Sequence, residues 1–226
     1  MPKVLDWVYE NERTVFIITA LLLIFLWVHF NPTLSSLYLG FLVVSIILFI
    51  LDKNPELNLE RRKDNRSIAF LEAAIYYVVF FIIYAVILSA FQTKFSIQTI
   101  LQSLSATTPI FANSVFLSVI AWGILVPVIE TLTFVRVYEW LVEKTHSSLN
   151  NWFSLIIPIF LISAAFMFFH LQAKGIKDIA ALIATFVFML ITLVIVTIKK
   201  ETKQAVLFHI FVNIIAVLTT FGLIFK

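Results

Sequence analysis

The chain has 226 residues, of which 62% are hydrophobic and 13% are charged, about half the charged fraction of an ordinary soluble domain. This composition excludes a water-soluble globular protein. The absence of cysteine excludes disulfides, thiolate metal sites and a cysteine nucleophile. The net charge of +3 is small and its basic residues lie mostly between apolar runs, so membrane topology rather than nucleic-acid binding explains them.

The apolar residues gather into runs of about 17 to 24 residues, the length that crosses a hydrocarbon core about 30 Å thick. Open sheet edges cannot exist in lipid, and the runs lack the alternation of a barrel strand. The sequence therefore predicts an all-α, polytopic membrane bundle of about seven transmembrane helices. In chain order the predicted spans are Thr14–Phe30, Ser35–Leu51, Ile68–Phe91, Ile110–Val142, Trp152–Leu171, Ile179–Ile198 and Gln204–Ile224.

The N-terminal part, residues 1–109, contains three of these spans and a charged loop, Asp52–Ser67. No small-residue cleavage site follows the first run, so we expect a retained hairpin rather than a signal peptide. The distribution of Lys and Arg places the charged loop and the N-terminus in the cytoplasm. The segment Gln92–Thr108 is too polar to span, and it forms either an interfacial helix or a plain loop.

The second part, residues 110–226, begins with an apolar stretch that is too long for one straight crossing. Ile110–Val142 has 33 residues, which would extend about 50 Å as a helix. Gly123 and Pro127 lie within it, and proline removes a backbone donor and clashes with the preceding turn. The sequence therefore predicts a kink or break near 123–127.

Ionisable residues are costly inside membrane spans, and they usually face a cavity or each other. Glu72 lies near the start of its span and is expected to reach the interface. Near the cytoplasmic end of their span lie Arg136, Glu139 and Glu143, either as an ordinary interfacial cluster or as a functional group. His29 and His146 are expected to be surface histidines. The remaining polar candidates in apolar surroundings are Glu130, His170, His209 and Asn213.

Glu130 lies in the run VPVIETLTF, with no Lys or Arg one helical turn away, so we expect it to face a polar cavity. His209 and Asn213 are four residues apart and share one helix face. Each polar residue alone could be interhelical glue, but together they favour a shared site. One feature opposes this prediction: straight helices would place His170 near the outer end of its span and His209 near the inner end of its own.

These residues resemble the motifs of an intramembrane protease family that includes the CAAX prenyl endopeptidases and the bacterial Abi proteins (CPBP family). That family carries E-E-x-x-x-R after a proline, then F-x-x-x-H, then H-x-x-x-N. Here Pro127 precedes Glu130, Phe166 and His170 give the second motif within SAAFMFFHL, and HIFVN gives the third. The first motif departs from the pattern, since Thr131 and Val135 stand where the family has the second glutamate and the arginine.

The resemblance implies an intramembrane endopeptidase with Glu130, His170, His209 and Asn213 as catalytic residues. Glu130 would act as the general base on a water, His170 would hold that water or the base, and His209 with Asn213 would stabilise the oxyanion. No cofactor is favoured. Zinc held by Glu130, His170 and His209 is the alternative, because two imidazoles and a carboxylate are acceptable ligands.

The partners that this interpretation implies are the lipid bilayer and a peptide or prenylated-protein substrate, with no nucleic acid. The expected location is the bacterial plasma membrane. Two other functions stay open. One is a catalytically impaired relative that acts as an immunity or regulatory membrane protein, which Thr131 and Val135 favour. The other is a proton-coupled transporter in which the carboxylate and the histidines relay protons.

Overall fold

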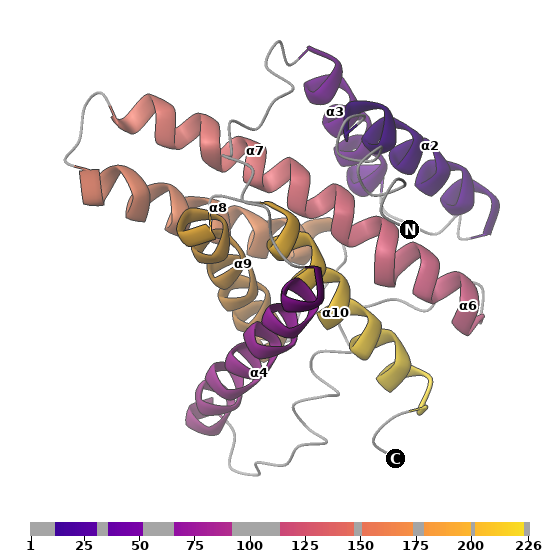
Figure 1. The fold of residues 1–226 in the computed structure, drawn as a ribbon. Coiled ribbons are helices and arrows are strands. Elements are labelled where there is room, and N and C mark those ends of the chain that lie inside the picture. The colour runs from indigo at the N-terminus through magenta and orange to yellow at the C-terminus, as the bar shows by residue number, and fades with distance from the viewer. Residues whose placement is uncertain are drawn as a thin grey trace.

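The computed structural model describes residues 12–30, 36–51, 66–91, 114–146, 151–173, 179–199 and 202–223. These residues are almost entirely helical, which confirms the predicted all-α class (Figure 1). The helices are α2 (Glu12–Phe30), α3 (Ser36–Leu51), α4 (Arg66–Phe91), α6 (Val115–Ser118), η1 (Val119–Leu125), α7 (Val126–His146), α8 (Asn151–Ala173), α9 (Ile179–Lys199) and α10 (Thr202–Thr220). Each predicted span corresponds to one of these helices, if the consecutive elements α6, η1 and α7 are taken as one long helix. The segment Gln92–Thr108 and most of the charged loop lie outside the described residues.

Four of the described helical stretches are long and apolar enough to cross a membrane, which supports an integral membrane protein. They are Val115–His146, Trp152–Leu171, Ile179–Lys199 and Thr202–Thr220, and α4 contains a shorter apolar stretch, Leu71–Ile87. The outer face of α4 is apolar as well, as lipid contact requires. Its exposed side chains recur with helical periodicity at Leu71, Ile75, Val78, Ile82 and Val86.

The buried side chains form two clusters that meet at α7. The larger cluster joins α4, α7, α8, α9 and α10 through aromatic rings such as Phe80, Phe166 and Phe188. The smaller one joins the α2–α3 hairpin to η1, α7 and α10 through Phe16, Trp122 and Ile129. Glu130 follows Ile129 directly, so α7 carries the carboxylate at the junction of the two apolar clusters.

The irregularity predicted near 123–127 is present as a π-helical segment rather than a sharp break. Over η1 the backbone widens, and the amide N–H of Val126 donates to the carbonyl of Ala121, five residues back. Pro127 follows immediately and has no N–H to offer. Helix α7 then continues in the same direction (Figure 1). Segments of this kind are frequent at functional sites.

Helices α8 and α10 both pack against the long helix in antiparallel register. Phe134 of α7 packs edge-to-face on Phe166 of α8, while Thr131 of α7 contacts His209 of α10. Further along, Asn213 contacts Trp122. Helix α10 therefore begins beside the middle of α7. Helix α9, which precedes it, is inclined to α7, so it returns the chain along only part of the length of α7 (Figure 1).

This inclination corrects the expectation that His170 and His209 lie too far apart. That expectation assumed that every helix stands perpendicular to the membrane and begins and ends at the same levels. In the structure His170 lies near the end of α8 and His209 lies seven residues into α10, yet both reach the level of Glu130. The oblique course of α9 accounts for this (Figure 1), since α8 starts one residue before and ends two residues after its predicted bounds and α10 starts only two residues early.

Gly123 allows the close approach of η1 and α10 on which this register depends. A Cβ atom placed on Gly123 would lie 3.0 Å from Cγ1 of Ile214 and 3.7 Å from its Cα. Gly40 on α3 is its natural control, because a Cβ there would meet nothing within 4 Å.

We expect Gly123→Leu to lower the free energy of unfolding by about 1–3 kcal/mol through overpacking, and Gly123→Ala to lower it by less. Gly40→Leu should leave it nearly unchanged. Thermal unfolding of the detergent-solubilised protein measures all three variants. Equal losses at both glycines would show that the close contact of Gly123 has no special role.

Candidate functional site

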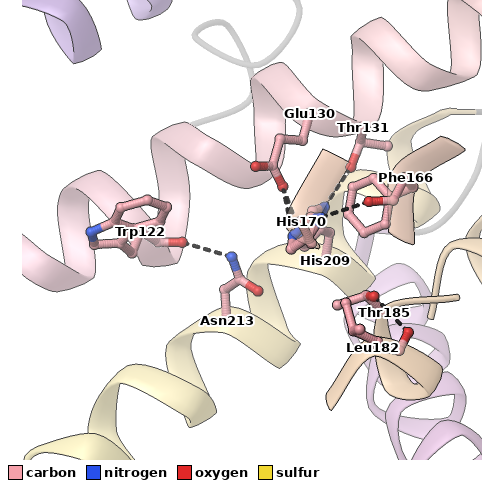
Figure 2. Close-up of polar contacts among 9 residues, drawn as sticks. All are labelled: Trp122, Glu130, Thr131, Phe166, His170, Leu182, Thr185, His209 and Asn213. Carbon is pink, nitrogen blue, oxygen red and sulfur yellow. Dashed lines mark hydrogen bonds and ion pairs between the residues drawn. The ribbon is translucent and has the colours of Figure 1, made fainter. Parts of the chain in front are cut away.

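The side chain of Glu130 is completely buried, with 0% exposure, and it projects from α7 toward α8 and α10 (Figure 2). Its neighbours along the helix, Ile129 and Thr131, are equally buried. The prediction that this carboxylate turns away from lipid is therefore consistent with the structure. A carboxylate removed from water in this way needs polar partners, and two imidazoles lie within 4.0 Å of it.

His170 approaches Glu130 from α8. Its Nε2 lies 4.0 Å from Oε2 of the carboxylate, and its Nδ1 lies 2.9 Å from the backbone carbonyl oxygen of Phe166, one turn earlier. The Phe166 ring packs on the imidazole with a centroid separation of 4.2 Å. The ring of His170 is therefore held on two sides, with Nε2 directed at the acid.

His209 approaches the same oxygen from α10. Its Nε2 lies 3.8 Å from Oε2 of Glu130, and its Nδ1 lies 2.9 Å from Oγ1 of Thr131. The Phe188 ring of α9 packs against this imidazole at 4.5 Å. Both imidazoles are almost fully buried, so four helices (α7, α8, α9 and α10) enclose the site.

The two distances to Glu130 exceed those of direct hydrogen bonds, which join nitrogen and oxygen at 2.7–3.2 Å. A water at about 2.8 Å from the carboxylate oxygen and from one Nε2 would subtend about 90° between them. The geometry therefore suits a water held between the acid and the imidazoles, which is the arrangement that a general base requires.

Asn213 shares a face of α10 with His209, as predicted, but its amide is directed to the backbone of η1. Its Nδ2 donates to the carbonyl of Trp122 at 2.9 Å (Figure 2). In a π-helix this carbonyl would pair with the amide of residue 127, which is Pro127 and lacks an N–H. Asn213 thus supplies a donor where proline cannot, and the second N–H of its amide is the one left for a ligand.

The same three side chains would form the donor set for a metal. Two ligands on tetrahedral zinc lie about 3.3 Å apart at bond lengths near 2.0–2.1 Å, whereas the carboxylate and imidazole atoms here are 3.8 and 4.0 Å apart. Within the described part of the chain, no group of three such residues is close enough to hold a metal ion. A metal at this position would require the ligands to draw closer by about 0.5 Å.

The other ionisable residues singled out from the sequence lie outside this site where the structure describes them, and the side chain of His29 is not among those described. Arg136 pairs with Glu139 at 3.4 Å on the surface of α7, and His146 is exposed, as expected for both. Glu72 differs from its prediction as a solvated helix end, because Lys199 of α9 binds it at 2.6 Å. Sequence reasoning missed this pair because the two residues lie 127 positions apart.

Thr131 is the site residue whose role the sequence did not indicate. It was noted only as a departure from the resembled motif, where the family has glutamate. Its position directly after Glu130 on α7 was a usable signal, because a buried threonine beside a buried acid can bond to the same histidines. In the structure it is completely buried and bonds His209.

Comparisons with models of protein families, with curated proteins and with solved structures returned no match. The likeness to the CAAX endopeptidase and Abi proteins therefore rests on the motif residues themselves. No family membership follows from the comparisons, and the chemical interpretation of the site rests on its geometry.

A double-mutant cycle tests the contact between Asn213 and the π-helical segment. We expect Asn213→Leu to lower the free energy of unfolding by about 1–3 kcal/mol, because the Trp122 carbonyl loses a donor in a buried setting. In a Pro127→Ala background the loss should shrink, since alanine provides the missing N–H. Chemical unfolding of the four proteins measures the coupling, and strictly additive losses would contradict the interpretation.

Proposed function

We propose that the chain is an intramembrane peptide hydrolase in which Glu130 activates a water. One observation carries the proposal: a completely buried carboxylate has the Nε2 atoms of two imidazoles from different helices at 3.8 and 4.0 Å. Polar side chains that only join membrane helices commonly do so through direct hydrogen bonds, which need shorter separations between nitrogen and oxygen. Separations of this size leave the acid and the imidazoles able to share a water, which supports the proposal.

In the proposed reaction Glu130 takes a proton from the water as its oxygen attacks the peptide carbonyl carbon. His170 holds the water through Nε2, and His209 donates to the developing oxyanion. The resemblance assigns Asn213 to the oxyanion as well, through the second N–H of its amide. Collapse of the tetrahedral intermediate breaks the C–N bond, and the proton held by Glu130 passes to the leaving amine. The apolar walls formed by Phe166 and Phe188 strengthen these electrostatic interactions by excluding bulk water.

The substrate class comes from the resemblance rather than from the site. The F-x-x-x-H and H-x-x-x-N motifs, with Pro127 before Glu130, are similar to those of proteins that process prenylated CAAX termini or small peptides. A peptide that reaches a site within the bilayer must itself be apolar or carry a lipid, which a prenyl group provides. We therefore propose a lipidated or hydrophobic peptide as substrate, and the bacterial plasma membrane with a cytoplasmic N-terminus as the setting.

We expect Glu130→Gln to reduce cleavage by about 10²–10⁴-fold, because the amide cannot accept the proton of the water. The assay incubates the purified protein in lipid vesicles with a prenylated CAAX peptide and detects the released tripeptide by mass spectrometry. A set of hydrophobic peptides without a prenyl group extends it to the broader substrate class.

Glu143→Gln is the matched control, since this glutamate lies on the same helix but is exposed. It should cleave at the parent rate. Retention of full activity by Glu130→Gln would refute the general-base role. A folded parent protein that cleaves none of the peptides would favour the non-catalytic alternative.

The metal-free form of the mechanism makes a separate prediction. Protein stripped with a strong chelator should keep its cleavage rate and contain no stoichiometric zinc by elemental analysis. Loss of activity on chelation, with recovery on adding zinc alone, would instead assign Glu130, His170 and His209 as ligands.

A further inference from the structure

The two imidazoles around Glu130 have different partners at their second ring nitrogens. Nδ1 of His170 faces the carbonyl oxygen of Phe166, and Nδ1 of His209 faces the hydroxyl of Thr131. A carbonyl can only accept a hydrogen bond, whereas a hydroxyl can donate one or accept one. This difference decides what each imidazole can present to the site.

Only one neutral tautomer of His170 fits its contacts. The Phe166 carbonyl requires a proton on Nδ1, so the neutral ring presents the bare Nε2 to Glu130. That nitrogen can accept a hydrogen bond from a water but cannot donate one. His170 is thus suited to hold the attacking water and unsuited to stabilise an oxyanion in its neutral form.

His209 can carry its neutral proton on the other nitrogen. If the Thr131 hydroxyl donates to Nδ1, the proton of the imidazole lies on Nε2 and points toward the carboxylate of Glu130, a favourable pairing. The other tautomer would direct two bare nitrogens at one carboxylate, which repels them unless it takes up a proton. The electrostatics of the site therefore favour donation from Thr131 to His209.

Thr131 also differs from most hydroxyl residues in these helices. The hydroxyls of Thr192, Thr197 and Thr219, for example, donate to the carbonyl four residues earlier in their own helix. The bond shown for Thr131 instead crosses to another helix, 78 residues away in the chain. The Thr131 hydroxyl therefore bonds to the His209 imidazole rather than to the backbone of its own helix.

We propose that Thr131 is a positioning residue that holds His209 with its proton on Nε2, so that His209 is the hydrogen-bond donor and His170 the acceptor at Glu130. The catalytic consequence of this assignment rests on the proposed hydrolase function, because a donor at His209 is what an oxyanion needs. The tautomer assignment itself rests only on the contacts of the two imidazoles.

Nitrogen-15 spectroscopy tests the assignment without any assay of activity. The chain has four histidines, and replacing His29 and His146 by glutamine leaves the two of interest. In bilayers containing the labelled protein, we expect one imidazole protonated on Nδ1 and one on Nε2. Thr131→Val should shift the bare Nδ1 resonance of the second ring and leave the first unchanged. Two rings that both carry the proton on Nδ1 would overturn the proposal.

The kinetic test uses three threonine variants in the vesicle assay. Thr131→Val should lower kcat roughly ten- to a hundred-fold with KM little changed, as expected when a group that orients a catalytic residue is lost. Thr131→Ser keeps the hydroxyl and should restore most of the rate. Thr133→Val is the control, because this buried threonine of α7 has no hydrogen-bond partner among the described residues.

The outcomes separate the two proposals. An unchanged kcat in Thr131→Val, in a protein that Glu130→Gln inactivates, would overturn the positioning role and leave the hydrolase standing. The predicted pair of tautomers in a protein that cleaves nothing would support the positioning role and count against the hydrolase.

Discussion

The burial of one carboxylate is the constraint on which the rest of the structure depends. Glu130 is removed from water between two apolar clusters, and an isolated charge there would cost several kcal/mol. The polar groups that offset this cost come from α8 and α10, so both helices must present a histidine at the depth of the acid. The antiparallel packing of both helices on α7 and the inclination of α9 meet this requirement.

The π-helical segment shows how a backbone irregularity can fix the position of a neighbouring helix. Pro127 prevents the regular pairing of the Trp122 carbonyl, and Asn213 of α10 donates to it. At the next residue, Gly123 allows Ile214 to approach closely. Asn213 lies on the same face of α10 as His209, so the geometry of the π-helical segment sets the register that brings this imidazole to Glu130.

The sequence was sufficient to predict the helices and to single out the buried polar residues of the candidate site, because both follow from local rules. Apolar runs of membrane length predict helices, and Glu130, His170 and His209 stand out because ionisable groups are rare in such runs. The depth of each residue could not be predicted in the same way. It depends on the inclination of α9, which is set by packing between helices and leaves no periodic signal in the sequence.

The pair of Lys199 and Glu72 and the bond from Thr131 to His209 escaped prediction for a related reason. Each joins helices that are distant in the chain, and either residue alone has an ordinary explanation. Glu72 near a helix end looks solvated, and threonine inside a helix usually bonds its own backbone. Only the relative placement of the helices distinguishes these residues from other glutamates near helix ends and other threonines within helices.

Thr131 also explains how the site can differ from the motif that it resembles. A second carboxylate at this position would place two acidic groups next to each other in a buried pocket, where like charges oppose one another. Within the described residues of this site the basic groups are two imidazoles, while Arg136 is paired with Glu139 elsewhere on α7. Val135, where the motif has arginine, is buried and apolar. The second acid and the arginine are therefore absent together. The Thr131 hydroxyl bonds to His209 without adding a negative charge, so no arginine is needed to balance one.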